Sequence, residues 1–265
     1  LLRFLKTGMS SAMAELQKRT GATRTDEDED EENMPDLGAC MREIVELDIS
    51  RNKIDKLPPD MGNLSSLTVL KVNNNRLEKV PRTIHYMEKL TELNLSSNLI
   101  MELPRNMGKL VSLLKLDLSA QIPGDLLSDL PLECRDMELL RELRLSHNHF
   151  RYLPQCLFPL DVVLKDGDFA GPGMTSLRVL AIDHNPLLGL DEDLACCGRL
   201  ERLLVNHTKI RRLNKSITYM RKLQEIWIND TGVSELDPAI SSLPELQKIV
   251  LDHEDQLMDF QSIRR

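Results

Sequence analysis

The chain has 265 residues and a formal net charge of −8, with 41% hydrophobic but only 3% aromatic residues. Seven negative charges lie in one run from Asp26 to Glu32, which leaves the rest of the chain nearly neutral. This lack of surplus positive charge argues against nucleic acid as a partner. No apolar run approaches the ~20 residues of a membrane-spanning helix. The aliphatic content is enough for a continuous core of Leu, Ile, Val and Met.

Residues 1–40 differ in character from the rest of the chain. Apolar residues recur at helical spacing from Leu2 to Leu16, which predicts a short amphipathic helix. The acidic run and the few apolar residues of 21–38 predict a solvated, disordered linker. We therefore expect an amphipathic N-terminal segment and acidic linker over 1–40, followed by one domain over 41–265.

A 23-residue repeat organises residues 41–265. The segment Leu67–Leu77 reads LTVLKVNNNRL, and 23 residues later Leu90–Ile100 reads LTELNLSSNLI. A fixed period in this range is typical of a solenoid. With the first residue of the pattern numbered position 1, eight full repeats and a partial ninth begin at Ile44, Leu67, Leu90, Leu113, Leu140, Leu177, Leu200, Leu223 and Leu246. The fourth and fifth repeats carry insertions, the second of them within 161–176.

The positions within a repeat predict its local structure. Positions 4 and 6 are apolar and should point inward from a short strand, while position 5 should point outward. Position 9 is usually Asn, whose amide can bond backbone groups of neighbouring repeats. These bonds would form a ladder along the solenoid. We expect the ladder to be broken by Gln121 in repeat four and by Thr208, Thr231 and Glu254 after repeat six. The second half, LPxxIxxL, predicts short helical or 3₁₀ segments on the convex side.

The pattern LPxxIxxLxxLxxLxLxxNxL resembles leucine-rich-repeat proteins, in particular the intracellular Ras-group and Ras-suppressor class. The match is good over 44–112 and again from Leu140 to Pro154. The resemblance implies an α/β fold, a right-handed leucine-rich-repeat solenoid or horseshoe with a parallel inner sheet. It also implies a non-catalytic protein-interaction scaffold or adaptor in signal transduction, with a small GTPase or its regulators as partner. A regulatory subunit of a phosphatase is the alternative within this class.

Cysteine usage bears on the compartment. The five cysteines are odd in number, and no cluster brackets the repeats. Extracellular members of the resembled family usually cap their ends with disulfide-bonded modules, so a reducing, cytoplasmic location is favoured.

The outward position 5 changes character along the chain. It is polar in the first five repeats and apolar in the last four, where it carries Ala181, Leu204, Trp227 and Val250. An outward apolar stripe usually marks an interaction surface. We predict a protein partner on the concave face of repeats six to eight, with Arg202, Glu225 and Asn229 as a polar rim. The alternative is that the C-terminal tail or residues near the insertion cover the stripe.

Position 8 carries a row of histidines beside this stripe. The row comprises His147, His184, His207, Asp230 and His253. Equivalent positions on adjacent strands lie ~4.8 Å apart, so we expect a pH-sensitive row that gains positive charge below about pH 6.5. A metal-dependent enzyme using this row is a further alternative, although straight rows rarely converge on a tetrahedral ion.

Catalytic signatures are otherwise missing from the sequence. It contains no G-x-G-x-x-G, H-E-x-x-H, C-x-x-C or G-x-S-x-G motif. We therefore predict no catalysis, no cofactor and no metal ligands.

Overall fold

The structure is a computed structural model that describes residues 43–122, 127–159, 173–234 and 236–252. The segment predicted over 1–40, most of the insertion in repeat five, His253 and the C-terminal tail lie outside these residues.

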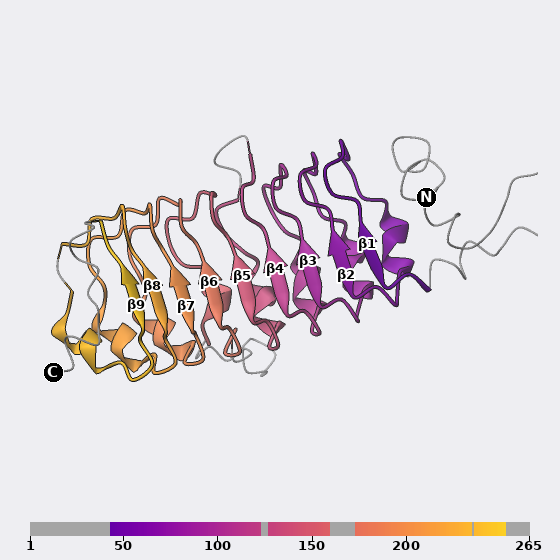
Figure 1. Cartoon of the computed structure of the whole chain (residues 1–265). Coiled ribbons are helices and arrows are strands. Elements are labelled where there is room, and N and C mark those ends of the chain that lie inside the picture. Colours follow the sequence, from indigo (N-terminus) through magenta and orange to yellow (C-terminus); the bar gives the residue numbers. More distant parts are fainter. Residues whose placement is uncertain (1–42, 123–126, 160–172, 235, 253–265) are drawn as a thin grey trace, which may run out of the picture.

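Parallel strands form one open sheet in which neighbours follow sequence order, as Figure 1 shows. The nine strands of the described residues are β1 (Glu46–Asp48), β2 (Val69–Lys71), β3 (Glu92–Asn94), β4 (Lys115–Asp117), β5 (Glu142–Arg144), β6 (Val179–Ala181), β7 (Arg202–Leu204), β8 (Glu225–Trp227) and β9 (Lys248–Val250). Each strand has three residues, and each repeat buries its core face only against its neighbours. The predicted leucine-rich-repeat solenoid is confirmed.

The strand register follows the repeat positions. Leu93 lies opposite Leu116, and across the longest repeat Leu143 still lies opposite Leu180. These position-4 side chains are at most 1% exposed, so they form the continuous core. Both insertions fall between strands, and they leave the pairing unchanged.

Short 3₁₀ helices line the solenoid on another side of the core (Figure 1). They are η2 (Pro59–Asn63), η3 (Arg82–Tyr86), η4 (Arg105–Lys109), η5 (Leu132–Asp136), η6 (Gln155–Leu157), η7 (Glu192–Cys196), η8 (Lys215–Tyr219) and η9 (Pro238–Ser242). Proline precedes the helices of the first five repeats, where its fixed φ suits the turn. In η8 and η9 the N-cap side chains of Asn214 and Asp237 accept from backbone N–H groups instead.

The position-9 ladder extends further than predicted. The Gln121 amide donates to the carbonyls of Leu95 and Leu118, and its Oε1 accepts from the N–H of Ile100 at 3.0 Å. Gln121 therefore joins repeats three and four as asparagine does elsewhere, and the predicted break at repeat four is wrong. Thr208, by contrast, donates to Val205 within its own repeat.

The residue at position 8 adopts a left-handed backbone conformation in all eight full repeats. Its φ lies between 51° and 57° in Arg51, Asn74, Ser97, Ala120, His147, His184, His207 and Asp230. Asn, Asp and His are the non-glycine residues most often found there. The turn that ends each strand therefore explains part of the histidine enrichment at this position.

Candidate functional site

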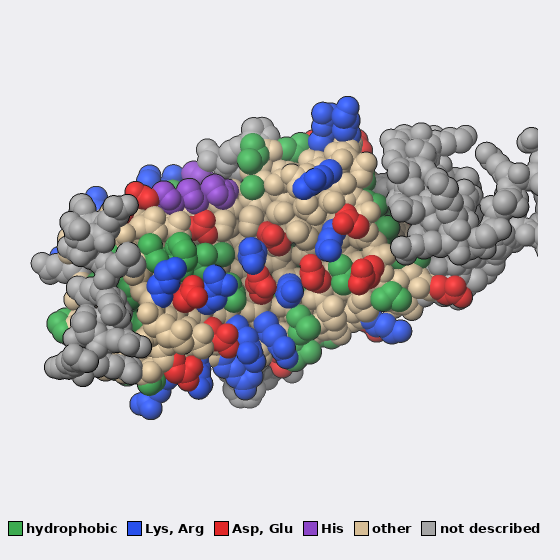
Figure 2. Space-filling model, viewed as in Figure 1, with side chains coloured by type: hydrophobic (Ala, Val, Ile, Leu, Met, Phe, Trp, Pro, Cys, Tyr) green, Lys and Arg blue, Asp and Glu red, His purple; other side chains and the backbone are tan. Residues whose placement is uncertain are grey.

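The face of the sheet turned away from the core, here called the open face, divides into a charged half and an apolar half. In the charged half, Lys115 lies 3.7 Å from Glu92, and Arg144 lies 2.5 Å from Glu142. These pairs line a shallow hollow of about 280 Å³ over β3 to β5. In the other half, Figure 2 shows hydrophobic side chains gathered next to the purple histidines.

The apolar half contains the predicted stripe. Strand pairing places Ala181 opposite Leu204, Leu204 opposite Trp227, and Trp227 opposite Val250. Leu204, Trp227 and Val250 are half-buried. Ala181 is only 6% exposed, because its single methyl group lies between longer neighbours on β5 and β7. The prediction of Ala181 as an exposed member is wrong, and the stripe available to a partner has three residues.

Both the indole nitrogen and the ring face of Trp227 have partners within the chain. Its indole Nε1 donates to Glu225 Oε2 at 3.1 Å, and Lys248 Nζ lies 4.3 Å from the ring centroid. Arg202 Nε lies 3.3 Å from the same Glu225 oxygen. A cation over an indole face is favourable by about 0.5–1 kcal/mol at an exposed site. The indole is therefore pre-oriented, and a partner need not order it on binding.

Asn229 and Asp230 border the stripe at the end of β8. Asn229 Nδ2 donates to Asp230 Oδ2 at 3.1 Å, and the same oxygen lies 3.2 Å from His207 Nδ1. Asn229 is thus tied to the histidine row rather than directed toward the stripe. Among the predicted rim residues, Glu225 is the one that bonds Trp227, and Arg202 pairs with Glu225.

The histidine row is stacked rather than separately solvated. The ring centroids of His147 and His184 are 4.0 Å apart with planes 12° apart, and those of His184 and His207 are 4.0 Å and 20° apart. The pKa of His184 lies below its ordinary value, first because of burial and then because His147 and His207 repel its positive form. Asp183 and Asp230 oppose this effect without cancelling it. The prediction that the row charges below about pH 6.5 therefore needs correction for His184.

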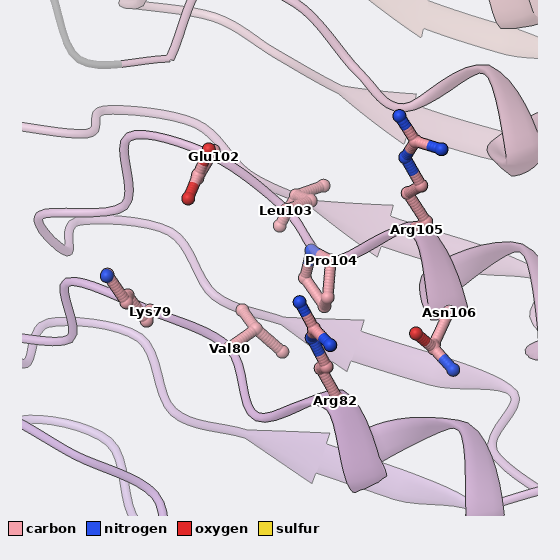
Figure 3. A pocket seen from close by; sticks show the side chains of 8 residues that line it. All are labelled: Lys79, Val80, Arg82, Glu102, Leu103, Pro104, Arg105 and Asn106. Atoms are coloured by element: carbon pink, nitrogen blue, oxygen red, sulfur yellow. The ribbon is translucent and has the colours of Figure 1, made fainter.

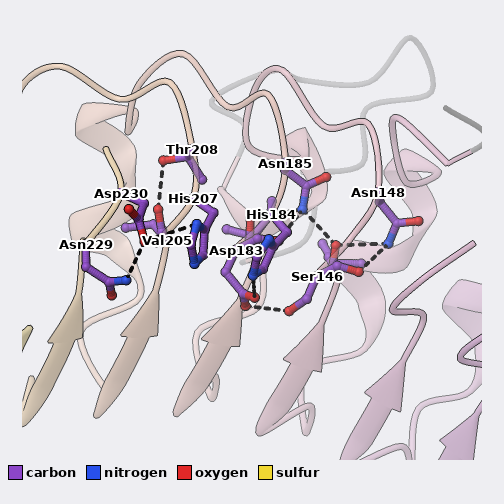
Figure 4. A network of polar contacts seen from close by, with 12 residues as sticks. Ser146, Asn148, Asp183, His184, Asn185, Val205, His207, Thr208, Asn229 and Asp230 are labelled. Carbon is purple, nitrogen blue, oxygen red and sulfur yellow. Dashed lines mark hydrogen bonds and ion pairs between the residues drawn. The ribbon is translucent and has the colours of Figure 1, made fainter. Parts of the chain in front are cut away.

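The sequence interpretation missed two polar side chains at position 7. Ser146 Oγ donates to Asp183 Oδ1 at 2.5 Å, and Asp183 Oδ2 lies 3.9 Å from His184 Nε2 (Figure 4). Side chains alternate along a strand, so position 7 shares the open face with positions 3 and 5. That alternation was the available signal.

A larger hollow lies away from the open face, between η3 and η4. It measures about 670 Å³ and is lined by Lys79, Val80, Arg82, Glu102, Leu103, Pro104, Arg105 and Asn106 (Figure 3). Lys79 and Glu102 stand at one end and Arg82 and Arg105 at the other. Arg105 also lies 3.7 Å from Glu133. The charged groups do not converge on one point, so this hollow is a weaker candidate than the open face.

The leucine rich repeat family model matches residues 42–100 and 65–121. The matched residues lie in the first four repeats, and the parallel sheet continues in the same register to β9, so the described residues have a leucine-rich-repeat fold. No curated protein matches the sequence.

Several solved structures share the fold. Internalin C2 of Listeria monocytogenes is 20% identical with a TM-score of 0.68, over 91% of this chain and 92% of that one. A leucine-rich-repeat protein of Leptospira interrogans is 24% identical with a TM-score of 0.66, over 83% of this chain. The plant peptide hormone receptor RGFR1, solved in complex with RGF2, is 21% identical with a TM-score of 0.57, over 74% of this chain.

The match spans 58% of the Leptospira chain and 30% of the receptor chain. At these identities the likeness shows the fold alone. Within the described residues, no helix has both the length and the apolar character needed to cross a lipid bilayer.

Proposed function

We propose that the chain is a non-catalytic protein-interaction scaffold whose partner binds the open face over β7 to β9, with Trp227 as the central anchor. The observation that carries this proposal is the contiguous row of Leu204, Trp227 and Val250 on adjacent strands. Trp is strongly enriched among residues that dominate binding energy, especially where polar groups surround it. The occupant is a protein segment that presents an apolar side chain to this row.

The surrounding charges support specific binding of a partner rather than non-specific hydrophobic association. Glu225 pairs with Arg202 and accepts from the indole N–H, and Lys248 lies over the ring, so the apolar row is framed by polar groups that already have partners. A partner gains most from apolar contact here, because the paired charges would resist desolvation. The charged half of the face, with Lys71 on β2, would contribute orientation more than affinity.

The class of partner and the compartment come from the sequence pattern. The Ras-group resemblance favours a cytoplasmic protein and a small GTPase, or one of its regulators, as partner. The cysteines of the described residues are free thiols, which agrees with a reducing compartment. The complex of the plant receptor RGFR1 with RGF2 supports the general use of this fold to hold a polypeptide.

The test compares three forms of the chain as bait in native cell extract, namely the parent, Trp227→Ala and Lys71→Ala. Circular dichroism first establishes that each variant is folded. Truncation of a central anchor costs at least ~2 kcal/mol, or about 30-fold in affinity. We expect a partner that binds the parent and Lys71→Ala but is lost with Trp227→Ala.

The same extract is split into portions loaded with GDP or with a non-hydrolysable GTP analogue. Nucleotide-dependent capture would support the small GTPase, while capture independent of nucleotide would exclude it as the direct partner. Equal partner affinity for Trp227→Ala and the parent would contradict the binding site itself.

A further inference from the structure

Two histidines and one aspartate converge where β5 and β6 end, beside the apolar row. The ligand atoms of His147, Asp183 and His184 all lie within 4.8 Å of one another. Two imidazoles and a carboxylate are a donor set that suits zinc and related divalent transition metals. We propose that these three side chains bind one such ion, with Zn²⁺ as the expected species and water in the remaining position.

The backbone holds both histidines in place. His147 and His184 adopt φ values of 55° and 53°, and the N–H of His147 donates to the carbonyl of Asp183 at 3.0 Å. The N–H of His184 donates to the carbonyl of Asn206, also at 3.0 Å. The two turns are thus tied directly to each other and to the next repeat. The backbone at both histidines is therefore already ordered, so little backbone conformational entropy is lost when an ion binds.

The carboxylate is oriented by its own partner. Ser146 Oγ bonds Asp183 Oδ1, and this leaves Oδ2 directed to the His184 ring (Figure 4). Metal-ligating carboxylates are commonly held in this way by a hydrogen bond from outside the ligand set. The Asp183 carboxylate is therefore already oriented toward His184 before an ion binds.

The adjustment that an ion requires is small. Bonds of about 2.0–2.2 Å in a tetrahedron separate the ligand atoms by roughly 3.3–3.6 Å. The three side chains must therefore close by on the order of 1 Å. The rings now stack nearly parallel and must tilt so that both nitrogen lone pairs meet at the ion. His147 is exposed and the His184 side chain is 36% exposed, so both have room to turn.

The left-handed turn alone does not account for this cluster. Earlier repeats place Arg51, Ser97 and Ala120 in the same conformation, so the backbone has no requirement for histidine. What distinguishes repeats five and six is that two histidines adjoin Asp183. The site is also independent of Trp227, which lies on β8.

The experiment measures Zn²⁺ binding to the metal-free full chain at neutral pH, in competition with a chromophoric chelator. The parent is expected to bind one ion at this site. His184→Asn and Asp183→Asn should each weaken that binding by at least ~10-fold. Asn tolerates the left-handed turn, and Asn at 183 can still accept from Ser146, so both variants should fold. Circular dichroism of the metal-free forms verifies this.

Two controls separate the site from other ligands. His85→Asn changes a histidine on η3, and Trp227→Ala removes the proposed partner anchor; both should retain the parent affinity for zinc. With Co²⁺ in place of zinc, a visible absorption band should appear in the parent and vanish in His184→Asn. Equal zinc affinity in the parent and His184→Asn, or no stoichiometric binding by the parent, would overturn the proposal.

Discussion

Replacing Asn98 with Ala tests how much the position-9 ladder contributes to holding repeats together. Asn98 is 1% exposed. Its Nδ2 donates to the carbonyls of Val72 at 3.1 Å, Leu95 at 2.9 Å and Ser96 at 3.2 Å. Its Oδ1 accepts from the N–H of Leu77 at 3.0 Å. One side chain therefore bonds backbone groups of two successive repeats.

The expected cost follows from what remains after truncation. The carbonyl of Val72 keeps a donor in Asn75, and that of Leu95 keeps one in Gln121. The N–H of Leu77, in a residue that is 0% exposed, loses its Asn98 acceptor. A buried donor left unpaired costs about 1–3 kcal/mol, and each other lost bond about 0.5–1.5 kcal/mol. We expect Asn98→Ala to lower the free energy of unfolding by about 3 kcal/mol.

The assay is urea unfolding followed by far-UV circular dichroism, combined with amide hydrogen exchange. Protection should fall most in repeats two and three, because each repeat contacts only its neighbours. Asn63→Ala, at an exposed position in η2, is the matched control and should change stability by less than about 0.5 kcal/mol. The reasoning is refuted if Asn98→Ala and Asn63→Ala unfold at the same urea concentration.

Two further substitutions test the ladder and the stacking of the helices. Thr208→Asn should raise the melting temperature through a gain of about 1 kcal/mol, because Asn185 at the same position bonds two successive repeats; a lower melting temperature would contradict this. Gly108→Ala should destabilise by about 1–3 kcal/mol, since the new methyl carbon would lie 1.9 Å from the carbonyl oxygen of Glu133. Gly198→Ala, whose nearest neighbour would be 3.9 Å away, is its control, and equal melting temperatures for these two variants would show that η4 and η5 are not closely packed there.

The sequence by itself determined the solenoid, the strand positions and their register. A strict period places Leu93 opposite Leu116, because a one-residue slip would expose the entire core face of a strand. The same argument predicted the pairing of Leu204 with Trp227 on the open face. These results depend only on the order of apolar and polar residues along the chain.

The tertiary structure decided what the side chains do once the strands are in place. Ala181 has the right position for the stripe but too short a side chain to reach its surface. Gln121 continues a ladder that its residue type had seemed to break, because its amide still reaches the same backbone groups. The approach of Asp183 to His184 depends on a left-handed turn that alternation along a strand does not describe. Periodicity sets which face a residue occupies, whereas reach, burial and ring orientation depend on distances between neighbouring repeats.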